Sequence, residues 1–348
     1  MAEVLADDDR RVDAQRLSEL LGVNVVAVDV VDDTAGSANR LRLHVTYADD
    51  GAGLPSRLFL KRNLARFSFP TEMYATEVRV YRDVLPGLAL EQPAVYAIEA
   101  RDDDVHFSIL MEDVSLRPGA RVGHVLDPTT PDEVDSVLDT LARVHAAYWG
   151  GERLTRELAW ATSPVDNASM RFWAEVGPRL TRRHLESGHR AALVDATRWP
   201  PDGWWPAFER LLVADTTGPH TLLHGDVHAS NVYYVTGAPG GLLDWQLALR
   251  GSWALDVTYL LTTALTPAQR GANERDLLRS YLDRLGALGV DGPSFDEAWL
   301  RYRQNVLYGV MMWLITPDAV HSDEAQACFL TRCLTAAEEL QTMPALQP

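Results

Sequence analysis

The first third of the chain is dominated by short stretches in which apolar and polar residues alternate, a pattern typical of β-strands. Residues 41–47 alternate strictly, and residues 25–31 are rich in β-branched side chains. The same signals return at residues 58–61, 94–100 and 106–111. The connections between the first three stretches are too short to hold crossover helices, so we expect these strands to pair antiparallel.

Two segments in the same region have helical spacing instead. In residues 12–22 three leucines fall on one face, and Gly22 is placed to end the helix. Residues 72–84 return to helical spacing between the third and fourth strand patterns. Residues 1–113 are therefore predicted to form a small lobe, a sheet of about five strands that carries one internal helix.

After residue 113 the pattern becomes mostly helical, and residues 131–149 give the clearest example. Thr130 is predicted to cap the helix, with Pro131 at its first position and Glu133 completing a capping box. The apolar residues that follow form one stripe: Val134, Val137, Leu138, Leu141, Val144 and Tyr148. Later helices are predicted to begin at Thr266, near Ser294 and at Ser322. The fold class is therefore α+β, with a helical second lobe over residues 114–348.

Length, charge and composition limit the number of lobes, the classes of partner and the cellular location that we expect. The chain has 348 residues, more than one ordinary domain, which favours two lobes. Its formal net charge of −17 argues against nucleic acid and anionic membrane surfaces as partners. The start of the chain lacks a secretion signal and the apolar runs are too short to cross a bilayer, so we expect a cytoplasmic location. Two cysteines, Cys328 and Cys333, predict buried thiols rather than a disulfide, and no pattern indicates an oligomeric state.

The residues most capable of chemistry lie in one polar stretch between short apolar runs. His224 and Asp226 are followed by Asn231, with four residues between Asp226 and Asn231, and Asp244 lies 13 positions further on. A Gly-rich turn at residues 236–241 is predicted to fold Asp244 back toward Asn231. Phosphoryl transfer requires a carboxylate base and oxygen ligands for Mg²⁺. This spacing therefore predicts Asp226 as the base, with Asn231 and Asp244 as the metal ligands.

The stretch resembles the aminoglycoside phosphotransferase and choline kinase superfamily, and residues 242–246 are similar to its ecdysteroid-kinase-like branch. The resemblance implies the protein-kinase-like fold, with a small antiparallel β-sheet lobe, a larger helical lobe, and ATP as the phosphoryl donor. It also implies that Asp256 supports the catalytic loop, residues 224–231, and that residues 151–215 are an insert that helps to form the acceptor pocket. Matching landmarks run in order from about residue 34 to residue 260.

In the first lobe the resemblance assigns the nucleotide contacts. Lys61 corresponds to the strand lysine that contacts the phosphates, and Glu77 to the helical glutamate that pairs with it. The carbonyl of Glu112 and the amide of Val114 correspond to the adenine contacts, and Gly36 belongs to the loop that covers the phosphates. That loop has only one glycine, and in the catalytic loop Ser230 stands where the family usually has glycine.

The sequence therefore predicts an ATP- and Mg²⁺-dependent phosphotransferase that acts on a hydroxyl of a small molecule. The acceptor is left open among amino alcohols, sugars, antibiotics and lipophilic metabolites. One alternative is a metal-dependent hydrolase that uses His224, Asp226, His228 and Asp244, because alternate residues of a strand share a face. The other is a catalytically silent nucleotide-binding regulatory protein.

Overall fold

The computed structural model describes residues 12–35, 38–63, 70–101, 104–186, 189–195 and 203–347. The chain divides into two compact units. The first comprises Met1–Gly87 and Gln92–Pro118, and the second comprises Leu88–Glu91 and Gly119–Pro348. The boundary between the units thus lies after Pro118, five residues later than the boundary predicted from the sequence. The short segment Leu88–Glu91 also belongs to the second unit.

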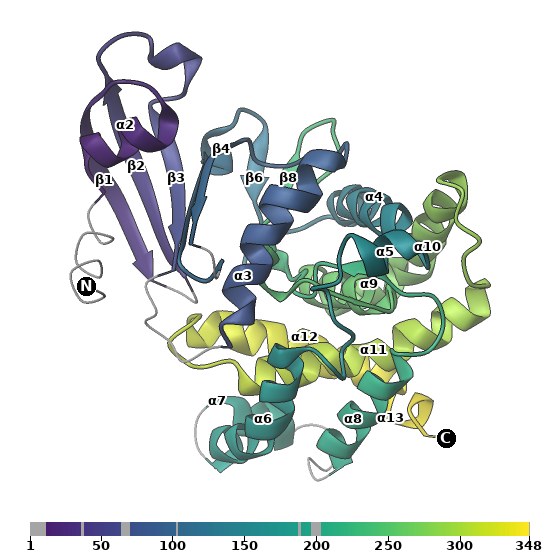
Figure 1. Ribbon diagram of the computed structural model, residues 1–348. Coiled ribbons are helices and arrows are strands. Elements are labelled where there is room, and N and C mark those ends of the chain that lie inside the picture. Colours follow the sequence, from purple (N-terminus) through teal and green to yellow (C-terminus); the bar gives the residue numbers. More distant parts are fainter. Residues whose placement is uncertain are drawn as a thin grey trace. The chain divides into compact units, whose positions relative to one another are not determined.

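The first unit contains an antiparallel sheet of five strands (Figure 1). Its order is β1-β2-β3-β5-β4. The predicted meander is confirmed for the first three strands, whereas the last strand in sequence, β5, lies between β3 and β4. The strand bounds are β1 Val25–Ala35, β2 Asn39–Tyr47, β3 Arg57–Arg62, β4 Val95–Ala100 and β5 Phe107–Glu112.

The first helix, α2 (Ala14–Leu21), supplies the apolar cover of this sheet. Asp13 caps its start, and Gly22 ends it with φ of 67°, as predicted. Leu17 on this helix packs into one cluster with residues of four strands, namely Val25, Leu41, Leu43, Val45, Leu58, Leu60 and Leu110. Because side chains alternate along a strand, β3 directs Leu58 and Leu60 to this core, and Phe59 and Lys61 to the opposite face.

The internal helix of the first unit, α3 (Glu72–Arg79), lies between β3 and β4 in sequence. It continues into a wider π-type turn over Val80–Val84, so the segment predicted as one helix is regular only in its first eight residues. Glu77 and Val78 on this helix are buried.

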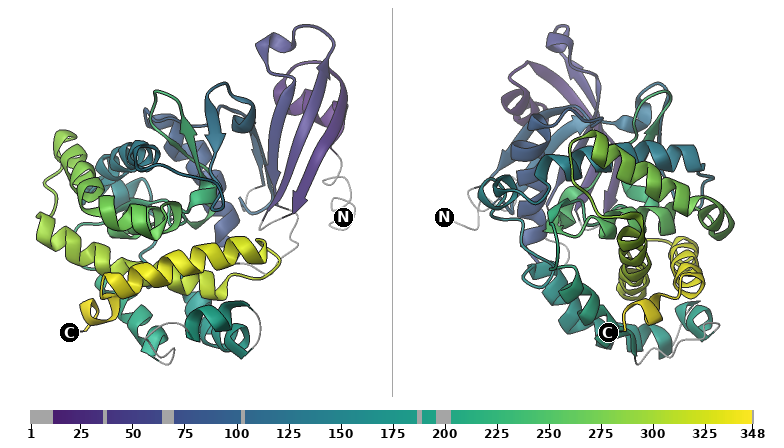
Figure 2. Two further views of the ribbon diagram at one scale, coloured as in Figure 1. Left: turned by 180° about the vertical axis from the view of Figure 1, so that it is seen from behind. Right: turned by 90° about the vertical axis from the view of Figure 1, so that its right-hand side faces the viewer.

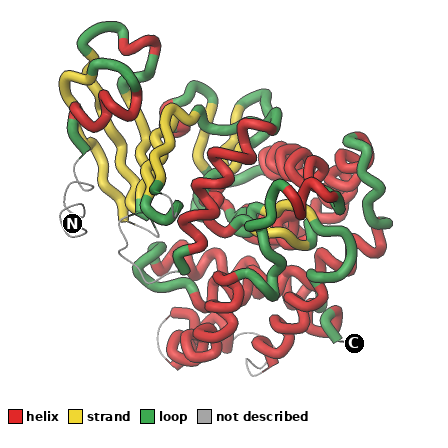
Figure 3. The backbone as a smooth tube through the Cα atoms, viewed as in Figure 1, coloured by secondary structure: helices red, strands yellow, loops and turns green. Residues whose placement is uncertain are grey.

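The second unit is largely helical, as the tube coloured by secondary structure shows (Figure 3). All four predicted N-caps are present, and Thr130, Thr266 and Ser294 form complete capping boxes. The helix bounds are α4 Pro131–Tyr148, α5 Glu152–Arg156, α6 Ala168–Glu186, α7 His189–Asp195, α8 Trp204–Ala214, α9 Ala254–Ala264, α10 Pro267–Ala287, α11 Phe295–Ile315, α12 Asp323–Glu339 and α13 Thr342–Ala345.

Two small sheets support the polar loop of this unit. The first has the order β6-β8-β9, formed by Ala120–Val122, Val232–Val235 and Gly241–Leu242. In the second, β7 (Thr221–Leu223) pairs with β10 (Leu249–Gly251). Neither β6 nor β10 was predicted, because each has only three residues, which is too few for an alternation to indicate a strand.

Helices α9 and α11 form the centre of the second unit. Every residue of α9 is buried, and so is each residue of α11 from Asn305 to Ile315. Helix α12 runs beside α11 in all views (Figures 1 and 2). Both cysteines on α12 are free thiols; Cys333 is buried as predicted, but Cys328 is only half-buried. Within the described residues, no helix is both long and apolar enough to span a bilayer.

A buried carboxyl group joins the insert to α11. Asp215, at the end of α8, is 1% exposed and accepts a hydrogen bond from Asn305 Nδ2 at 3.2 Å. Burial raises the pKa of Asp215 to about 7, because the charged form loses its hydration. The carboxyl group is therefore largely protonated in the folded protein at mildly acidic pH.

This predicts a loss of stability as pH rises. The folded state holds a proton that the unfolded state, with its ordinary pKa of 3.8, has already released. The contribution of Asp215 is thus full below pH 3.8 and declines through the window up to about pH 7. The Asp215→Asn variant should lack this decline. The unfolding free energy of the variant minus that of the parent should therefore be roughly 2–3 kcal/mol larger at pH 8 than at pH 5. Urea unfolding of both proteins at these two pH values measures the difference, and parallel pH profiles would contradict the assignment.

Candidate active site

The phosphate lysine predicted from the sequence lies in a buried ion pair of the first unit. Lys61 is on β3 and is 3% exposed, and its Nζ donates to Oε1 of Glu77 on α3 at 2.6 Å. Lys61 occupies the face of β3 opposite the Leu58 and Leu60 core, which is where α3 presents Glu77. The backbone of Lys61 is paired on both sides, with Arg40 and with Ile109, so the strand itself is firmly held.

The predicted adenine contacts follow the end of β5 in the same unit. The Glu112 carboxylate receives two hydrogen bonds from Arg117, each 2.7 Å long, and this hydrogen bonding lowers its pKa. Asp113 accepts hydrogen bonds from Arg42 Nε and from the Ser115 N–H, which fixes the start of the short turn at Val114. Gly36, which was predicted to lie in the loop that covers the phosphates, is outside the described residues.

The catalytic loop of the second unit connects β7 to β8 through a 3₁₀ turn at Ala229–Asn231. Gly225 is required at its position for two reasons. Its φ of 79° is one that residues with a side chain rarely adopt, and a Cβ there would lie 2.2 Å from the Leu247 carbonyl oxygen. Ser230, which replaces the glycine of the family pattern, is not among the described residues with positive φ, so its side chain introduces no backbone strain.

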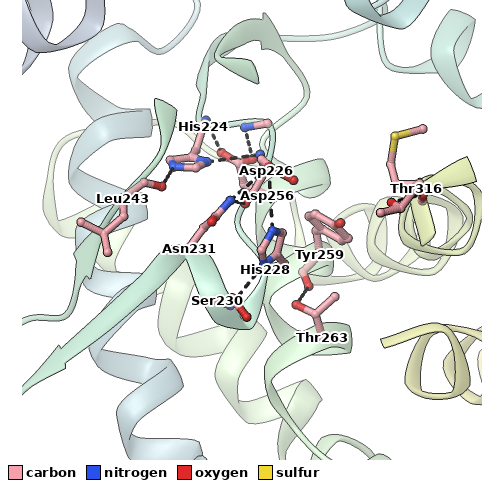
Figure 4. Close-up of polar contacts among 12 residues, drawn as sticks. His224, Asp226, His228, Ser230, Asn231, Leu243, Asp256, Tyr259, Thr263 and Thr316 are labelled. Atoms are coloured by element: carbon pink, nitrogen blue, oxygen red, sulfur yellow. Dashed lines mark hydrogen bonds and ion pairs between the residues drawn. The ribbon is translucent and has the colours of Figure 1, made fainter. Parts of the chain in front are cut away.

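The carboxylate of Asp256 holds the start of this loop (Figure 4). Asp256 is on the first turn of α9 and fully buried, and it accepts hydrogen bonds from the N–H of His224 at 2.7 Å and of Gly225 at 2.9 Å. A ring nitrogen of His145 on α4 lies 3.2 Å from the same carboxylate, and its other nitrogen lies 2.7 Å from the hydroxyl of Tyr281 on α10. The loop is thus tied to α9 directly and to α4 and α10 through Asp256.

The His224 side chain links the loop to the strand that delivers Asp244. Its Nδ1 accepts the N–H of Asp226 at 3.2 Å, which leaves the proton on Nε2, and Nε2 donates to the Leu243 carbonyl at 2.9 Å (Figure 4). The ring also packs against Trp245, with the centroids 4.5 Å apart. His224 therefore supports the backbone through hydrogen bonds.

Asn231 lies beside the predicted base. Its Nδ2 donates to the Asp226 carboxylate Oδ2 and to the Asp226 carbonyl, both at 3.0 Å. With the nitrogen turned toward Asp226, the amide oxygen Oδ1 accepts no hydrogen bond from the described part of the chain. The Asn231 carbonyl accepts the N–H of Leu243 at 2.8 Å, so the hairpin brings Asp244 back beside Asn231 as predicted.

Asp244 itself has an unusual backbone conformation. It is 8% exposed and adopts the left-handed region with φ of 66° and ψ of 68°. A residue with a side chain is strained there by about 1–3 kcal/mol and keeps the conformation only when its surroundings enforce it. Such strain is common at functional sites, and here the flanking Leu243 and Trp245 are both held by His224.

His228 is placed close to the same carboxylate. Its Nδ1 accepts the N–H of Ser230 at 3.2 Å, and its Nε2 lies 3.8 Å from Asp226 Oδ2. The ring is 5% exposed and is surrounded by aromatic neighbours, namely Tyr259, Trp313, His321 and Phe329. His228 thus lies between the loop and the helices α9, α11 and α12.

Sequence reasoning missed two residues that hold the loop. His145 could have been found, since it continues the buried stripe of α4 one turn after Leu141, and a polar residue on a buried face needs a partner. Tyr308 donates its hydroxyl to the Gly225 carbonyl at 2.8 Å, but it begins a run of apolar residues on α11 and carries no signal of its own.

With this geometry established, comparison with known proteins is decisive at the level of the family. The sequence model of the phosphotransferase enzyme family, APH, matches residues 33–299. The chain belongs to this phosphotransferase family. It is accordingly a small-molecule kinase. The match does not distinguish branches of the family, so the ecdysteroid-kinase-like branch stays a prediction.

Solved structures of phosphotransferases share the fold of this family member. A candidate aminoglycoside phosphotransferase from Ralstonia eutropha is 16% identical, with 97% of this chain and 98% of that chain covered and a TM-score of 0.55. APH(2″)-IIIa, solved with GDP and kanamycin, is 11% identical over 94% of this chain and 98% of that one, with a TM-score of 0.54. A spectinomycin phosphotransferase solved with ADP and spectinomycin is 10% identical over 94% and 97%, with a TM-score of 0.52. No curated protein matches the sequence of this chain.

The ion pair of the first unit leads to a prediction about stability. The Lys61→Met variant leaves the Glu77 carboxylate buried without its cation, which costs roughly 3–5 kcal/mol of unfolding free energy. Replacing both partners, as in Lys61→Met with Glu77→Leu, removes the uncompensated charge and should recover most of that loss. Urea unfolding of the two variants and the parent gives the comparison. Equal losses in the single and double variants would show that the pair is not a buried charge pair in solution.

Proposed function

We propose that this phosphotransferase transfers the γ-phosphoryl group of ATP to a hydroxyl group of a small molecule, with Asp226 as the base. The proposal depends mainly on the hydrogen bond between Asn231 and the Asp226 carboxylate. The loop that holds both residues is fixed by the hydrogen bonds from its amides to Asp256. One oxygen of the Asp226 carboxylate, Oδ2, accepts the Asn231 amide. That contact helps to fix the carboxylate that would accept the proton of the acceptor.

The chemical step follows from these roles. The acceptor oxygen attacks the γ-phosphorus while the bond between this phosphorus and the oxygen bridging to the β-phosphate breaks. The acceptor proton passes to the Asp226 carboxylate, and ADP leaves with the electron pair of the broken bond. Catalysis of this kind is mainly positional and electrostatic. The hydrogen bonds around Asp226 would contribute by fixing its carboxylate in position before the substrate binds.

The residues beside Asp226 suit a magnesium ion. Mg²⁺ takes hard oxygen ligands, and Asn231 Oδ1 and the Asp244 carboxylate are groups of that kind. Asn231 lies just before β8 and Asp244 just after β9, which are adjacent strands of one hairpin. The orientation of the Asn231 amide supports this, since its nitrogen is engaged by Asp226 and its oxygen is left to bind. When bound there, the ion would supply positive charge that neutralises the charge developing on the phosphates.

We assign the nucleotide contacts to the first unit. Lys61, oriented by Glu77, would contact the phosphates, and the Glu112 carbonyl and Val114 amide would contact the base. The proteins of similar fold were solved with ADP in one case and with GDP in another, so the donor has to be tested with both nucleotides.

The hydrolase alternative is disfavoured by the hydrogen bonds of the loop. Both ring nitrogens of His224 are engaged, and Nδ1 of His228 accepts the Ser230 N–H. A metal held by these histidines would have to break contacts that keep the loop in place. Among the residues that the structure describes, no group of three or more His, Cys, Asp and Glu side chains is arranged to hold a metal ion.

The charge of the insert narrows the choice of acceptor. Residues 151–215 contain nine arginines, no lysine, and nine Asp and Glu residues, so the net charge of −17 lies entirely outside the insert. A polycationic acceptor is bound best by a surplus of carboxylates. We therefore favour an acceptor that is neutral or apolar over a polycationic aminoglycoside.

The first test measures thermal stabilisation by nucleotide. Mg²⁺ with ATP should raise the melting temperature of the parent by a few degrees, since a ligand that binds only the folded state stabilises it. The Asp244→Ala variant should lose this shift, whereas Asp291→Ala, which changes an exposed loop aspartate, should keep it. GTP is compared in parallel. A shift that persists in Asp244→Ala would remove Asp244 from the nucleotide site.

The second test addresses the base. A panel of amino alcohols, sugars, macrolides and sterols is screened for phosphorylation with Mg²⁺ and the preferred nucleotide. With any acceptor found, Asp226→Asn should lower kcat by about 10²–10⁴-fold while nucleotide stabilisation is retained, because only proton removal is lost. Full activity of Asp226→Asn would overturn its assignment as the base.

A further inference from the structure

Tyr308 on α11 touches the catalytic loop at the residue before the proposed base. Its side chain is fully buried, and its hydroxyl donates to the carbonyl oxygen of Gly225 at 2.8 Å. The N–H of Gly225 donates to Asp256 Oδ1 at 2.9 Å. The two backbone groups of Gly225 are therefore held by two helices, α9 and α11, from outside the loop.

This carbonyl belongs to the peptide unit that joins Gly225 to Asp226. The orientation of that peptide unit therefore affects the direction in which the Asp226 side chain projects from the loop. Gly225 has φ of 79° and, as a glycine, has many other conformations open to it. The N–H of this peptide unit donates to His224 Nδ1 at 3.2 Å, so without Tyr308 the unit would be held on one side only. A buried carbonyl left without a partner is also unfavourable, which makes the Tyr308 hydroxyl the second restraint on rotation of this peptide unit.

The ring of Tyr308 connects this restraint to the insert. It packs edge-on against Tyr259 of α9 at a centroid distance of 5.2 Å, and against Phe208 at 6.4 Å. Phe208 is fully buried and belongs to α8, within residues 151–215. A continuous path of packed side chains thus runs from the insert, through the Tyr308 ring and hydroxyl, to the peptide unit of Asp226.

We propose that Tyr308 is a positioning residue for phosphoryl transfer, which fixes the Gly225–Asp226 peptide and links it to the packing of helix α8. This inference rests on the proposed role of Asp226 as the base. Tyr308 takes no part in the chemistry itself. Its removal should therefore misplace the base without altering how tightly the nucleotide binds.

Helix α11 offers a matched control. Tyr302 is likewise fully buried and donates its hydroxyl to a buried acceptor, Glu274 Oε2, at 2.9 Å, but this contact lies in an ionic cluster with Arg270 and not at the loop. Tyr302→Phe and Tyr308→Phe each remove one buried hydroxyl and keep the ring. A purely structural role predicts the same behaviour for both variants.

The experiment combines kinetics with hydrogen–deuterium exchange. With Mg²⁺ and ATP as the probe and ADP release as the signal, Tyr308→Phe should lower kcat about tenfold and leave the KM for ATP within about twofold of the parent. Exchange in the peptide covering residues 221–232 should rise severalfold in Tyr308→Phe, because the Gly225 amide loses its fixed geometry. Tyr302→Phe should match the parent in both measurements.

A second variant tests the link to the insert. Phe208→Leu keeps the Tyr308 hydroxyl but removes the ring that packs against it from α8. Phe208→Leu should raise exchange in the peptide covering residues 221–232 to a smaller extent than Tyr308→Phe does. In the double variant, Phe208→Leu should add less to this exchange than it does as a single change, since both substitutions act through one contact. Fully additive effects would limit the inference to Tyr308 and refute the link to α8.

The outcomes separate this inference from the proposed function. Asp226→Asn is measured beside the other variants. If Asp226→Asn abolishes ADP release but Tyr308→Phe changes neither kcat nor loop exchange, the positioning role is wrong and the base assignment stands. If Asp226→Asn leaves ADP release unchanged, the base assignment fails first, and a rise in loop exchange in Tyr308→Phe would then report only a structural contact.

Discussion

The polar loop of the second unit depends on one buried carboxylate, that of Asp256. Both of its oxygens accept hydrogen bonds from consecutive amides of the loop, and His145 lies beside it. A buried carboxylate is costly unless its hydrogen bonds are satisfied, so loop and helix require each other. Its position on the first turn of α9 adds the favourable field of the helix N-terminus. This mutual requirement explains why α9 is buried along its whole length: the helix serves as the fixed support from which the loop is built.

Further contacts restrict the backbone of the loop beyond the two amides that Asp256 binds. Gly225 is held at its N–H by α9 and at its carbonyl by α11, and His224 ties the loop to the strand before Asp244. Strand β6 approaches the far end of the loop so closely that a Cβ on Gly123 would lie 2.2 Å from the Ala229 carbonyl oxygen. The strained backbone of Asp244 persists because its neighbours are fixed in this way. Catalysis by positioning requires such rigidity, since phosphoryl transfer asks for few reacting groups but for accurate placement.

What the sequence could predict was local, and what it could not was tertiary. Helix starts such as Thr130 and Thr266 were found because a cap and its partner are three residues apart. The proximity of Asp226, Asn231 and Asp244 could be predicted because one loop and one hairpin connect them within 19 residues. Tyr308 reaches Gly225 across 83 positions, and no property of an apolar run on a helix indicates that one hydroxyl within it has a loop carbonyl as its partner. The order of β5 and β4 was missed for the same reason, since strand order depends on packing between distant segments.

The same distinction explains why the reaction can be read from this chain more readily than its acceptor. The proposed chemistry uses groups fixed by short-range contacts within the loop and the hairpin, and their spacing is visible in the sequence. The acceptor would instead meet the insert, whose helices α6, α7 and α8 are placed by packing on α11 and α12 rather than by a motif. The insert carries no net formal charge, whereas the rest of the chain is strongly acidic, so we propose that the insert would select the acceptor by shape and apolar contact. Under that proposal, the packing of α8 on Tyr308 would be the point where acceptor recognition and the geometry of the base meet.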